Sequence, residues 1–258
     1  MNRINKKFNE LIEKNEKALI TYVTAGDPDL DTTEKIIYAK IKGGADIIEL
    51  GIPFSDPLAD GPVIQEASLR SLQQGTTPEK VFSLVEKVRK KSEIPLVLLV
   101  YYNTVLSYGI EKFVGRCKYN IDGVIIPDLP FEESGEILPY FAETDTALIP
   151  MLSPTSHDRI ENILNLFNEK GFVYCVTSLG VTGMESSFYN DLNNYLARVR
   201  RHSKLPICAG FGIKNKNDFD KISPMVDGVI IGSAIVNEIH TKGFSEEGLE
   251  KYIAIFKE

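Results

Sequence analysis

Two acids in the segment 49–60, Glu49 and Asp60, have the residue types and the surroundings that proton transfer requires. Glu49 follows the aliphatic pair Ile47 and Ile48, and Asp60 is carried by a loop rich in Pro and Gly. An unpaired carboxylate beside aliphatic side chains is costly to bury, and a raised pKa lets it keep its proton at neutral pH. A carboxylic acid in that state suits general acid catalysis. Glu49 is therefore a candidate general acid, with a cap on a neighbouring turn as the structural alternative.

Asp60 supports two readings when its own position is considered. It precedes a glycine, and Asp-Gly is a common turn, while a helix could begin near Val63 and take Asp60 as its cap. The neighbouring Asp56 and the earlier Asp27 each precede a proline and favour turns. Asp128, in Pro-Asp-Leu-Pro, fits either a neighbour of the active site or a support for the loop around Asp56.

The composition predicts one globular domain over residues 1–258. The chain is 43% hydrophobic and 25% charged, with a net charge of -7, which argues against nucleic acid or an anionic membrane as partner. The three cysteines, Cys117, Cys175 and Cys208, show no CxxC spacing and indicate reduced core residues. The longest apolar run, residues 94–102, is far shorter than the roughly 18 residues of a membrane span. The first apolar stretch, residues 18–23, is too short for a signal-peptide core, so a soluble, cytoplasmic protein is expected.

Short aliphatic runs alternate with longer segments of helical periodicity along the whole chain. This alternation predicts a parallel sheet with helices outside it, and eight such units in 258 residues favour a single (β/α)8 TIM barrel over a doubly wound sheet. Residues 2–15 place Ile4, Phe8, Leu11 and Ile12 on one helical face, which predicts an extra N-terminal helix capping the barrel bottom. The predicted strands are residues 19–24, 46–51, 96–101, 123–127, 147–152, 172–177, 206–210 and 228–232.

The groups at the strand ends narrow the chemistry, because barrel enzymes place their active sites there. No lysine ends a predicted strand, which disfavours a Schiff base, and no set of metal ligands can be assembled from these ends. Carboxylates and tyrosines remain, and they suit acid–base chemistry without metal or organic cofactor. Gly210-Phe-Gly and Gly232-Ser follow the last two predicted strands, where barrels often bind phosphate on backbone N–H groups. The alternative is that these glycines only permit tight turns.

A long loop after the sixth predicted strand, residues 178–189, contains two glycines and several polar residues. Such a composition suits a lid that closes over a site, and it also suits a plain surface loop. Within that strand, Tyr174 could point into the barrel mouth and orient an acid, or belong to the ordinary core.

Several motifs together resemble the tryptophan synthase alpha subunit over essentially the whole length. They are Glu-Leu-Gly-Ile-Pro-Phe-Ser-Asp-Pro-Leu-Ala-Asp-Gly-Pro-Val-Ile-Gln at 49–65, Thr-Ala-Gly-Asp-Pro at 24–28, Pro-Asp-Leu-Pro at 127–130, Gly-Val-Thr-Gly at 180–183 and Gly-Phe-Gly-Ile at 210–213. The resemblance implies retro-aldol cleavage of indole-3-glycerol phosphate to indole and glyceraldehyde 3-phosphate. It also implies a beta subunit that carries pyridoxal phosphate and receives the indole in an αββα heterotetramer.

The same resemblance implies roles for individual residues. Glu49 and Asp60 fall on the family's catalytic acids, in agreement with the burial argument above. Tyr174 would help to place Glu49, and Thr182, on the lid, would close against Asp60. The indole pocket would be lined by Tyr22, Leu99 and Tyr101. The phosphate would be held by Phe211, Gly212, Gly232 and Ser233.

Two departures from some relatives stand out: Ser178 replaces a lid arginine, so that lid closure would rest on different contacts, and Tyr22 replaces a phenylalanine and adds a hydroxyl that needs a partner. The resemblance also implies that the loops around residues 53–58 and 103–108 face the beta subunit. The interface residues it implies are Pro53, Asp56, Pro57, Asn103 and Pro130.

Three other functions compete with this one at the level of sequence. A phosphosugar isomerase on the same barrel would share the phosphate site, although the 49–65 motif argues against it. A stand-alone indole-3-glycerol-phosphate lyase would release free indole. A non-catalytic phosphate-ligand-binding subunit that only activates a partner would have no need of a buried acid at Glu49.

Overall fold

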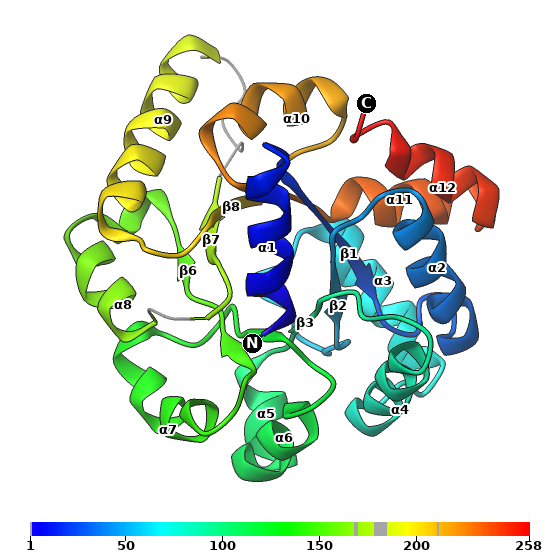
Figure 1. Ribbon diagram of the computed structural model, residues 1–258. Helices are drawn as coiled ribbons and strands as arrows, with labels where there is room; N and C mark the ends of the chain where they lie inside the picture. Colours follow the sequence, from blue (N-terminus) through cyan, green and yellow to red (C-terminus); the bar gives the residue numbers. More distant parts are fainter. Residues whose placement is uncertain (1, 168–169, 178–184, 211) are drawn as a thin grey trace.

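The protein is a ring of parallel strands enclosed by helices, as the computed structural model in Figure 1 shows. The structure describes residues 2–167, 170–177, 185–210 and 212–258. The strands are β1 Ala18–Thr24, β2 Ile47–Gly51, β3 Leu96–Leu99, β4 Gly123–Ile125, β5 Ala147–Leu148, β6 Met151–Leu152, β7 Val173–Val176, β8 Ile207–Gly210 and β9 Gly228–Ile231.

The order of the strands confirms the predicted TIM barrel. The sheet runs β5-β4-β3-β2-β1-β9-β8-β7-β6, and every pairing is parallel. The two outer members, β5 and β6, are consecutive pieces of the predicted strand 147–152, so the chain itself closes the ring. Pro150 separates them, since a proline has no N–H to donate to a ladder.

The helices form an outer layer around the strands (Figure 1), and two apolar cores result. One core lies between strands and helices, and the other fills the barrel interior. The α-helices are α1 Arg3–Glu13, α2 Leu30–Lys42, α3 Pro62–Gln73, α4 Pro78–Arg89, α5 Tyr102–Tyr108, α6 Ile110–Cys117, α7 Leu138–Ala142, α8 Ile160–Leu166, α9 Glu185–His202, α10 Lys216–Ile222, α11 Ser233–Lys242 and α12 Glu246–Ala254. Short 3-10 helices are η1 Phe131–Glu136, η2 Pro154–Arg159 and η3 Ser223–Met225.

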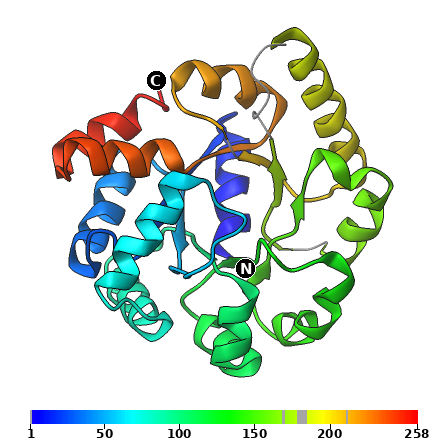
Figure 2. The ribbon, with the colours of Figure 1, turned by 180° about the vertical axis from the view of Figure 1, so that it is seen from behind.

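Helix α1 closes the end of the barrel where the strands begin. The Asn2 side chain caps the helix by accepting a hydrogen bond from the Ile4 N–H, and it donates to the Asp122 carbonyl at the start of β4. Ile4, Phe8 and Leu11 are buried in the interior core. In Figure 1 this helix crosses the middle of the ring, and in Figure 2 it lies behind it. The predicted capping helix is confirmed, with Ile12 exposed instead of buried.

Three aspartates just ahead of strands perform one structural task at this same end. Asp46, Asp122 and Asp227 precede β2, β4 and β9, and each carboxylate accepts a hydrogen bond at 2.8 Å from the first or second N–H of the neighbouring strand. Each carboxylate also forms a salt bridge with a basic side chain, such as that between Arg89 and Asp122 at 2.6 Å. The Asp-Gly-Val-Ile-Ile sequence at 122–126 and 227–231 thus reflects a repeated way of fixing strand starts.

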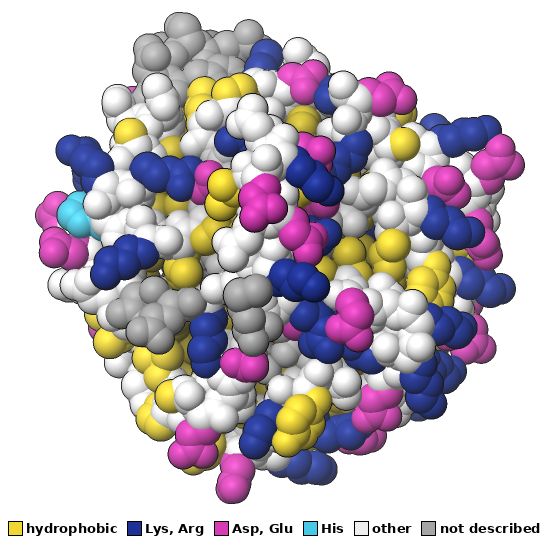
Figure 3. Space-filling model, viewed as in Figure 1, with side chains coloured by type: hydrophobic (Ala, Val, Ile, Leu, Met, Phe, Trp, Pro, Cys, Tyr) yellow, Lys and Arg dark blue, Asp and Glu magenta, His cyan; other side chains and the backbone are white. Residues whose placement is uncertain are grey.

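The cysteines and the surface charges agree with what the composition predicts. Cys117, Cys175 and Cys208 are buried and unpaired, as predicted. On the face that α1 covers, basic and acidic side chains are interspersed (Figure 3). Within the described residues, no helix is both long and apolar enough to cross a membrane.

Candidate active site

A cavity of about 310 Å³ opens at the carboxyl ends of the strands, opposite α1. It brings together eight of the residues singled out from the sequence, which come from strands β1, β2, β3 and β7 and from the segments that follow β2, β8 and β9. These are Tyr22, Glu49, Asp60, Leu99, Tyr174, Gly212, Gly232 and Ser233. Thr182 and Phe211, together with Ser178, lie outside the described residues.

Glu49 is the buried acid of this cavity. Its side chain points from β2 into the barrel with 1% of its surface exposed, and its Oε2 has no hydrogen-bond partner among the described residues. Burial raises the pKa of Glu49 to about 8, the nearby Asp60 adds to the rise, and Lys40 opposes it. Glu49 therefore carries a proton at neutral pH and can donate it into the cavity.

Asp60 faces the same cavity from the loop between β2 and α3. The Tyr101 hydroxyl donates to its Oδ2 at 3.0 Å and accepts from the Ala59 N–H at 3.0 Å, while the ring of Phe54 stacks on Tyr101 at 5.0 Å. Burial raises the pKa of Asp60 to about 6, and the hydrogen bond from Tyr101 opposes the rise. Asp60 is therefore largely ionised at pH 7, so the two acids of one cavity differ in charge.

Tyr101 contacts the site only indirectly, by its hydrogen bond to Asp60. It is not among the described residues that line the cavity, although the resemblance places it in the indole pocket. Asp128 has a structural contact: its Oδ1 accepts from the Tyr102 N–H at 2.8 Å and so joins the loops after β3 and β4.

Two tyrosines in the wall depend on glycines at the strand ends. The Tyr22 hydroxyl lies 3.1 Å from the Thr24 Oγ1, so the added hydroxyl has a partner. A Cβ atom at Gly51 would lie 2.1 Å from the Tyr22 hydroxyl oxygen, and a Cβ atom at Gly210 would lie 2.4 Å from that of Tyr174. Both glycines therefore make room for a ring that shapes the cavity.

The Gly51→Ala variant should lose affinity and rate for the substrate of this cavity. The new methyl group displaces the Tyr22 ring, and a shift of about 1 Å in a binding wall can cost up to about 10²-fold, so we expect kcat/KM to fall by about 10- to 100-fold. Steady-state kinetics checks this. Gly115→Ala is the control, because its Cβ atom meets nothing within 4 Å, and it should leave kcat/KM unchanged. An unchanged kcat/KM in Gly51→Ala would show that the wall tolerates a displaced Tyr22.

The far end of the cavity is suited to an anion. Gly212 has a φ of 81°, which favours glycine, and Gly232 precedes α11, so that the positive end of the helix dipole faces Ser233 and the cavity. No lysine or arginine lines the cavity in the described part of the chain. An anion here would be bound by backbone N–H groups and local dipoles.

The loops implied as a partner interface lie at this same end of the barrel. Asp56, Asn103 and Pro130 are exposed, Pro57 is partly exposed, and Pro53 is buried. Leu58 is 83% exposed on the loop after β2. Their contact with a partner stays a prediction.

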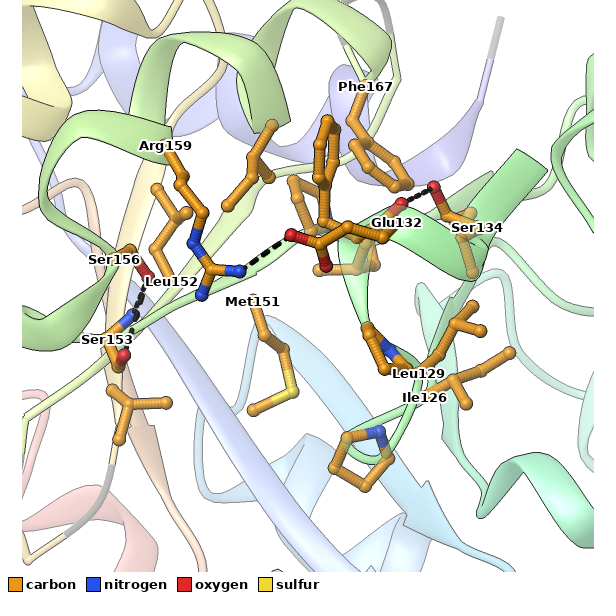
Figure 4. Close-up of a pocket in the computed structure, with 18 residues that line it drawn as sticks. Ile126, Leu129, Glu132, Ser134, Met151, Leu152, Ser153, Ser156, Arg159 and Phe167 are labelled. Atoms are coloured by element: carbon orange, nitrogen blue, oxygen red, sulfur yellow. Dashed lines mark hydrogen bonds and ion pairs between the residues drawn. The ribbon is translucent and has the colours of Figure 1, made fainter.

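A second cavity, of about 280 Å³, lies between the loops after β4 and β6. Arg159 and Glu132 pair across it at 2.8 Å, and the Ser153 N–H donates to the Ser156 Oγ (Figure 4). Glu132, the acid among its described lining residues, is half exposed and has a lowered pKa, chiefly through a backbone hydrogen bond. None of the described residues that line it is a protonated acid, so the Glu49 cavity is the candidate active site.

Sequence reasoning missed Lys40 in α2. This lysine is fully buried and donates from its Nζ to the carbonyl of Tyr22. The available signal was its spacing, because Lys40 follows Ile36 by four residues and Ile37 by three and so falls on the apolar face of its helix.

A protonated acid and an ionised acid, facing one cavity with an anion site at its far end, define a barrel enzyme of the acid–base type. Residues 8–258 match the family described as "Tryptophan synthase alpha chain". The chain belongs to this family, and it catalyses the lyase half-reaction that cleaves indole-3-glycerol phosphate.

Individual relatives agree over nearly the whole chain. The tryptophan synthase alpha chain of Alkaliphilus metalliredigens is 51% identical over 97% of this chain and 91% of its own length. That of Lachnospira eligens is 47% identical over 100% and 98%. Among solved structures, the tryptophan synthase subunit alpha of Legionella pneumophila superposes with a TM-score of 0.88 at 32% identity, covering 100% of this chain and 97% of that one. A chain of the Pyrococcus furiosus tryptophan synthase complex has a TM-score of 0.83 at 33% identity, covering 93% and 97%.

Proposed function

We propose that Glu49 is the general acid and base of the cleavage and that Asp60 is its electrostatic partner. The carrying observation is that Glu49 and Asp60 face one cavity with opposite protonation at neutral pH. Glu49 gives its proton to C3 of the indole ring, and the cation that results is stabilised at the ring N–H by the carboxylate of Asp60.

The second half of the reaction returns the proton. The carboxylate of Glu49 takes the proton of the glycerol hydroxyl beside the scissile bond, the carbonyl of glyceraldehyde 3-phosphate forms, and the electrons of the broken C–C bond return to the ring. Indole leaves, and Glu49 is again protonated. The proton count balances without any further reactant.

The substrate lies along the cavity with its ring toward Tyr22, Leu99 and Tyr174. This wall is apolar, whereas the backbone around Gly212, Gly232 and Ser233 receives the phosphate. The family resemblance also assigns Phe211 to the phosphate, and this residue lies outside the described residues. The family resemblance assigns Thr182 to a lid that closes against Asp60, and this residue lies outside the described residues.

The partner is a tryptophan synthase beta subunit, and the assembly is an αββα heterotetramer in the cytoplasm. Pyridoxal phosphate is held by the beta subunit, and in the described residues no lysine lines the cavity that could form a Schiff base with it. The similar Pyrococcus furiosus chain comes from a tryptophan synthase complex, and the exposed Leu58 lies on the implied interface loop. The interface comprises Pro53, Asp56, Pro57, Asn103 and Pro130. The whole chain, residues 1–258, forms a single domain.

The test is indole release from indole-3-glycerol phosphate by the purified chain, alone and with a tryptophan synthase beta subunit. We expect slow release that rises at least about tenfold with the partner, since binding orders the interface loops and the Asp60 loop together. Fast release by the chain alone would instead identify a stand-alone lyase. The chain contains no tryptophan, so indole fluorescence is measured against tyrosine emission only.

A further inference from the structure

A charged side chain lies inside the wall that carries the proposed acid. Lys40 of α2 is 0% exposed and sits among apolar neighbours such as Ile36 and Ile37. Its Nζ donates to the carbonyl oxygen of Tyr22 in β1, and no carboxylate of the described residues lies within ion-pair distance of it. Burying an ammonium group with one carbonyl partner is costly, and an aliphatic residue would fill the same space without that cost.

The position of Lys40 relates it to Glu49 through the strand pair β1–β2. Tyr22, whose carbonyl Lys40 holds, is the register partner of Glu49. The two side chains lie on opposite sides of the sheet: Ile36, Ile37 and the other α2 contacts belong to the outer core, whereas Tyr22 belongs to the interior core. Lys40 therefore stands behind the wall from which Glu49 projects.

The geometry points to Lys40 as a positioning residue of the cleavage reaction, whose ammonium group holds the Tyr22 strand from outside and stabilises the Glu49 carboxylate that exists after proton donation. This inference rests on the proposed role of Glu49 as the acid. Lys40 touches neither the cavity nor the reacting atoms.

The electrostatics of the two groups agree with this geometry. Burial lowers the pKa of Lys40, and Glu49 is the charged group that opposes this change. Lys40 in turn opposes the rise in the pKa of Glu49. Once Glu49 has given its proton away, its buried charge is stabilised by the ammonium group, which favours proton donation.

The other groups that face Glu49 do not change when Lys40 is replaced. Asp60 raises the pKa of Glu49, and Glu49 raises the pKa of both Tyr22 and Tyr174. Of the charged groups on α4 and α12, which pack against α2, none in the described residues acts on Lys40. A shift in the Glu49 titration can therefore be assigned to Lys40.

The experiment compares Lys40→Met, Lys40→Gln and a control, Lys42→Met, which removes an exposed lysine from the same helix. Lys40→Met keeps the volume and loses both the charge and the hydrogen bond. Lys40→Gln keeps a donor for the Tyr22 carbonyl and loses only the charge, so it serves as well if Lys40→Met does not fold. For each protein the pH profile of kcat is measured, and the Glu49 carboxyl is titrated by NMR with carboxyl-labelled glutamate, its signal assigned by its loss in E49Q.

We expect both Lys40 variants to move the Glu49 titration and the basic limb of kcat upward by at least about 0.5 pH unit, with kcat at pH 7 reduced by about tenfold and KM nearly unchanged. Lys42→Met should match the parent protein. An unmoved Glu49 titration in a folded variant overturns the inference about Lys40, whatever the activity. A moved titration with an unmoved kcat profile overturns instead the role of Glu49 as the acid, and the link of Lys40 to cleavage fails with it.

Discussion

The Glu49→Gln variant is expected to lose cleavage of indole-3-glycerol phosphate by about 10³-fold or more while keeping its fold. Glutamine preserves the shape of the side chain and removes the proton that must reach C3, and a positioned acid–base group typically contributes about 10²- to 10⁴-fold. Because the proposed mechanism assigns both proton transfers to Glu49, the loss should lie toward the upper part of that range. Indole release under saturating substrate measures it. Turnover within tenfold of the parent protein would exclude Glu49 as the acid.

The stability of the same variant provides an independent control. The pKa of Glu49 is raised from 4.5 to about 8, so the stability that its proton contributes is complete below pH 4.5 and is lost as the pH rises through 8. E49Q has no such titration. Its free energy of unfolding, measured in urea, should therefore increase relative to the parent protein between pH 4.5 and pH 8. A constant difference over this interval would show that Glu49 does not titrate there.

The Asp60→Asn variant should lose kcat by about 10²-fold, because an uncharged amide stabilises the cationic ring N–H far less than a carboxylate does. The hydrogen bond from the Tyr101 hydroxyl to Oδ2 is retained if the amide oxygen takes that place. Substrate binding should therefore persist. Single-turnover kinetics separates the two effects, since it reports the chemical step apart from affinity.

The pH dependence distinguishes the role of Asp60 from a turn residue. The pKa of Asp60 is about 6, so its charge is lost as the pH falls through 6, and kcat of the parent protein should show an acid limb there. D60N should lack this limb. D56N is the control, because Asp56 is exposed on the same loop and lies outside the cavity, and in the isolated chain it should leave the profile unchanged. Near-normal turnover in D60N would return Asp60 to the status of a turn residue.

The architecture was predictable from the sequence because strand and helix periodicity follow local burial. All eight predicted strands exist, although four of them end earlier than predicted, where the chain turns into the loops of the site. The prediction for residues 147–152 missed the break at Pro150, since the whole run is apolar and periodicity alone does not reveal a lost hydrogen bond. The capping helix followed from the spacing of Ile4, Phe8 and Leu11.

The site was predictable where a residue type and a strand end coincide. Glu49 and Gly232 are of this kind, whereas Tyr22 was implied by the resemblance alone, and all three line the cavity. The contact of Tyr101 with Asp60 was not predictable from the sequence, because it joins residues 41 positions apart through the packing of two loops. Lys40 was missed for a related reason: which face of a helix is buried is visible in the sequence, but the group that its Nζ meets is not.

The hydrogen bond that the Asp46 carboxylate accepts at the start of the strands affects the site at their other end. The carboxylate holds the N–H of Leu19, and from that point β1 and β2 run side by side, residue for residue. Three steps along each strand bring Tyr22 opposite Glu49. If either strand slipped by one residue, its own side chain, Tyr22 or Glu49, would turn to the outside of the barrel while the other stayed inside. The hydrogen bond at the amino-terminal end of the barrel thus determines which residues of β1 and β2 lie opposite each other at the carboxyl-terminal end, where the site is.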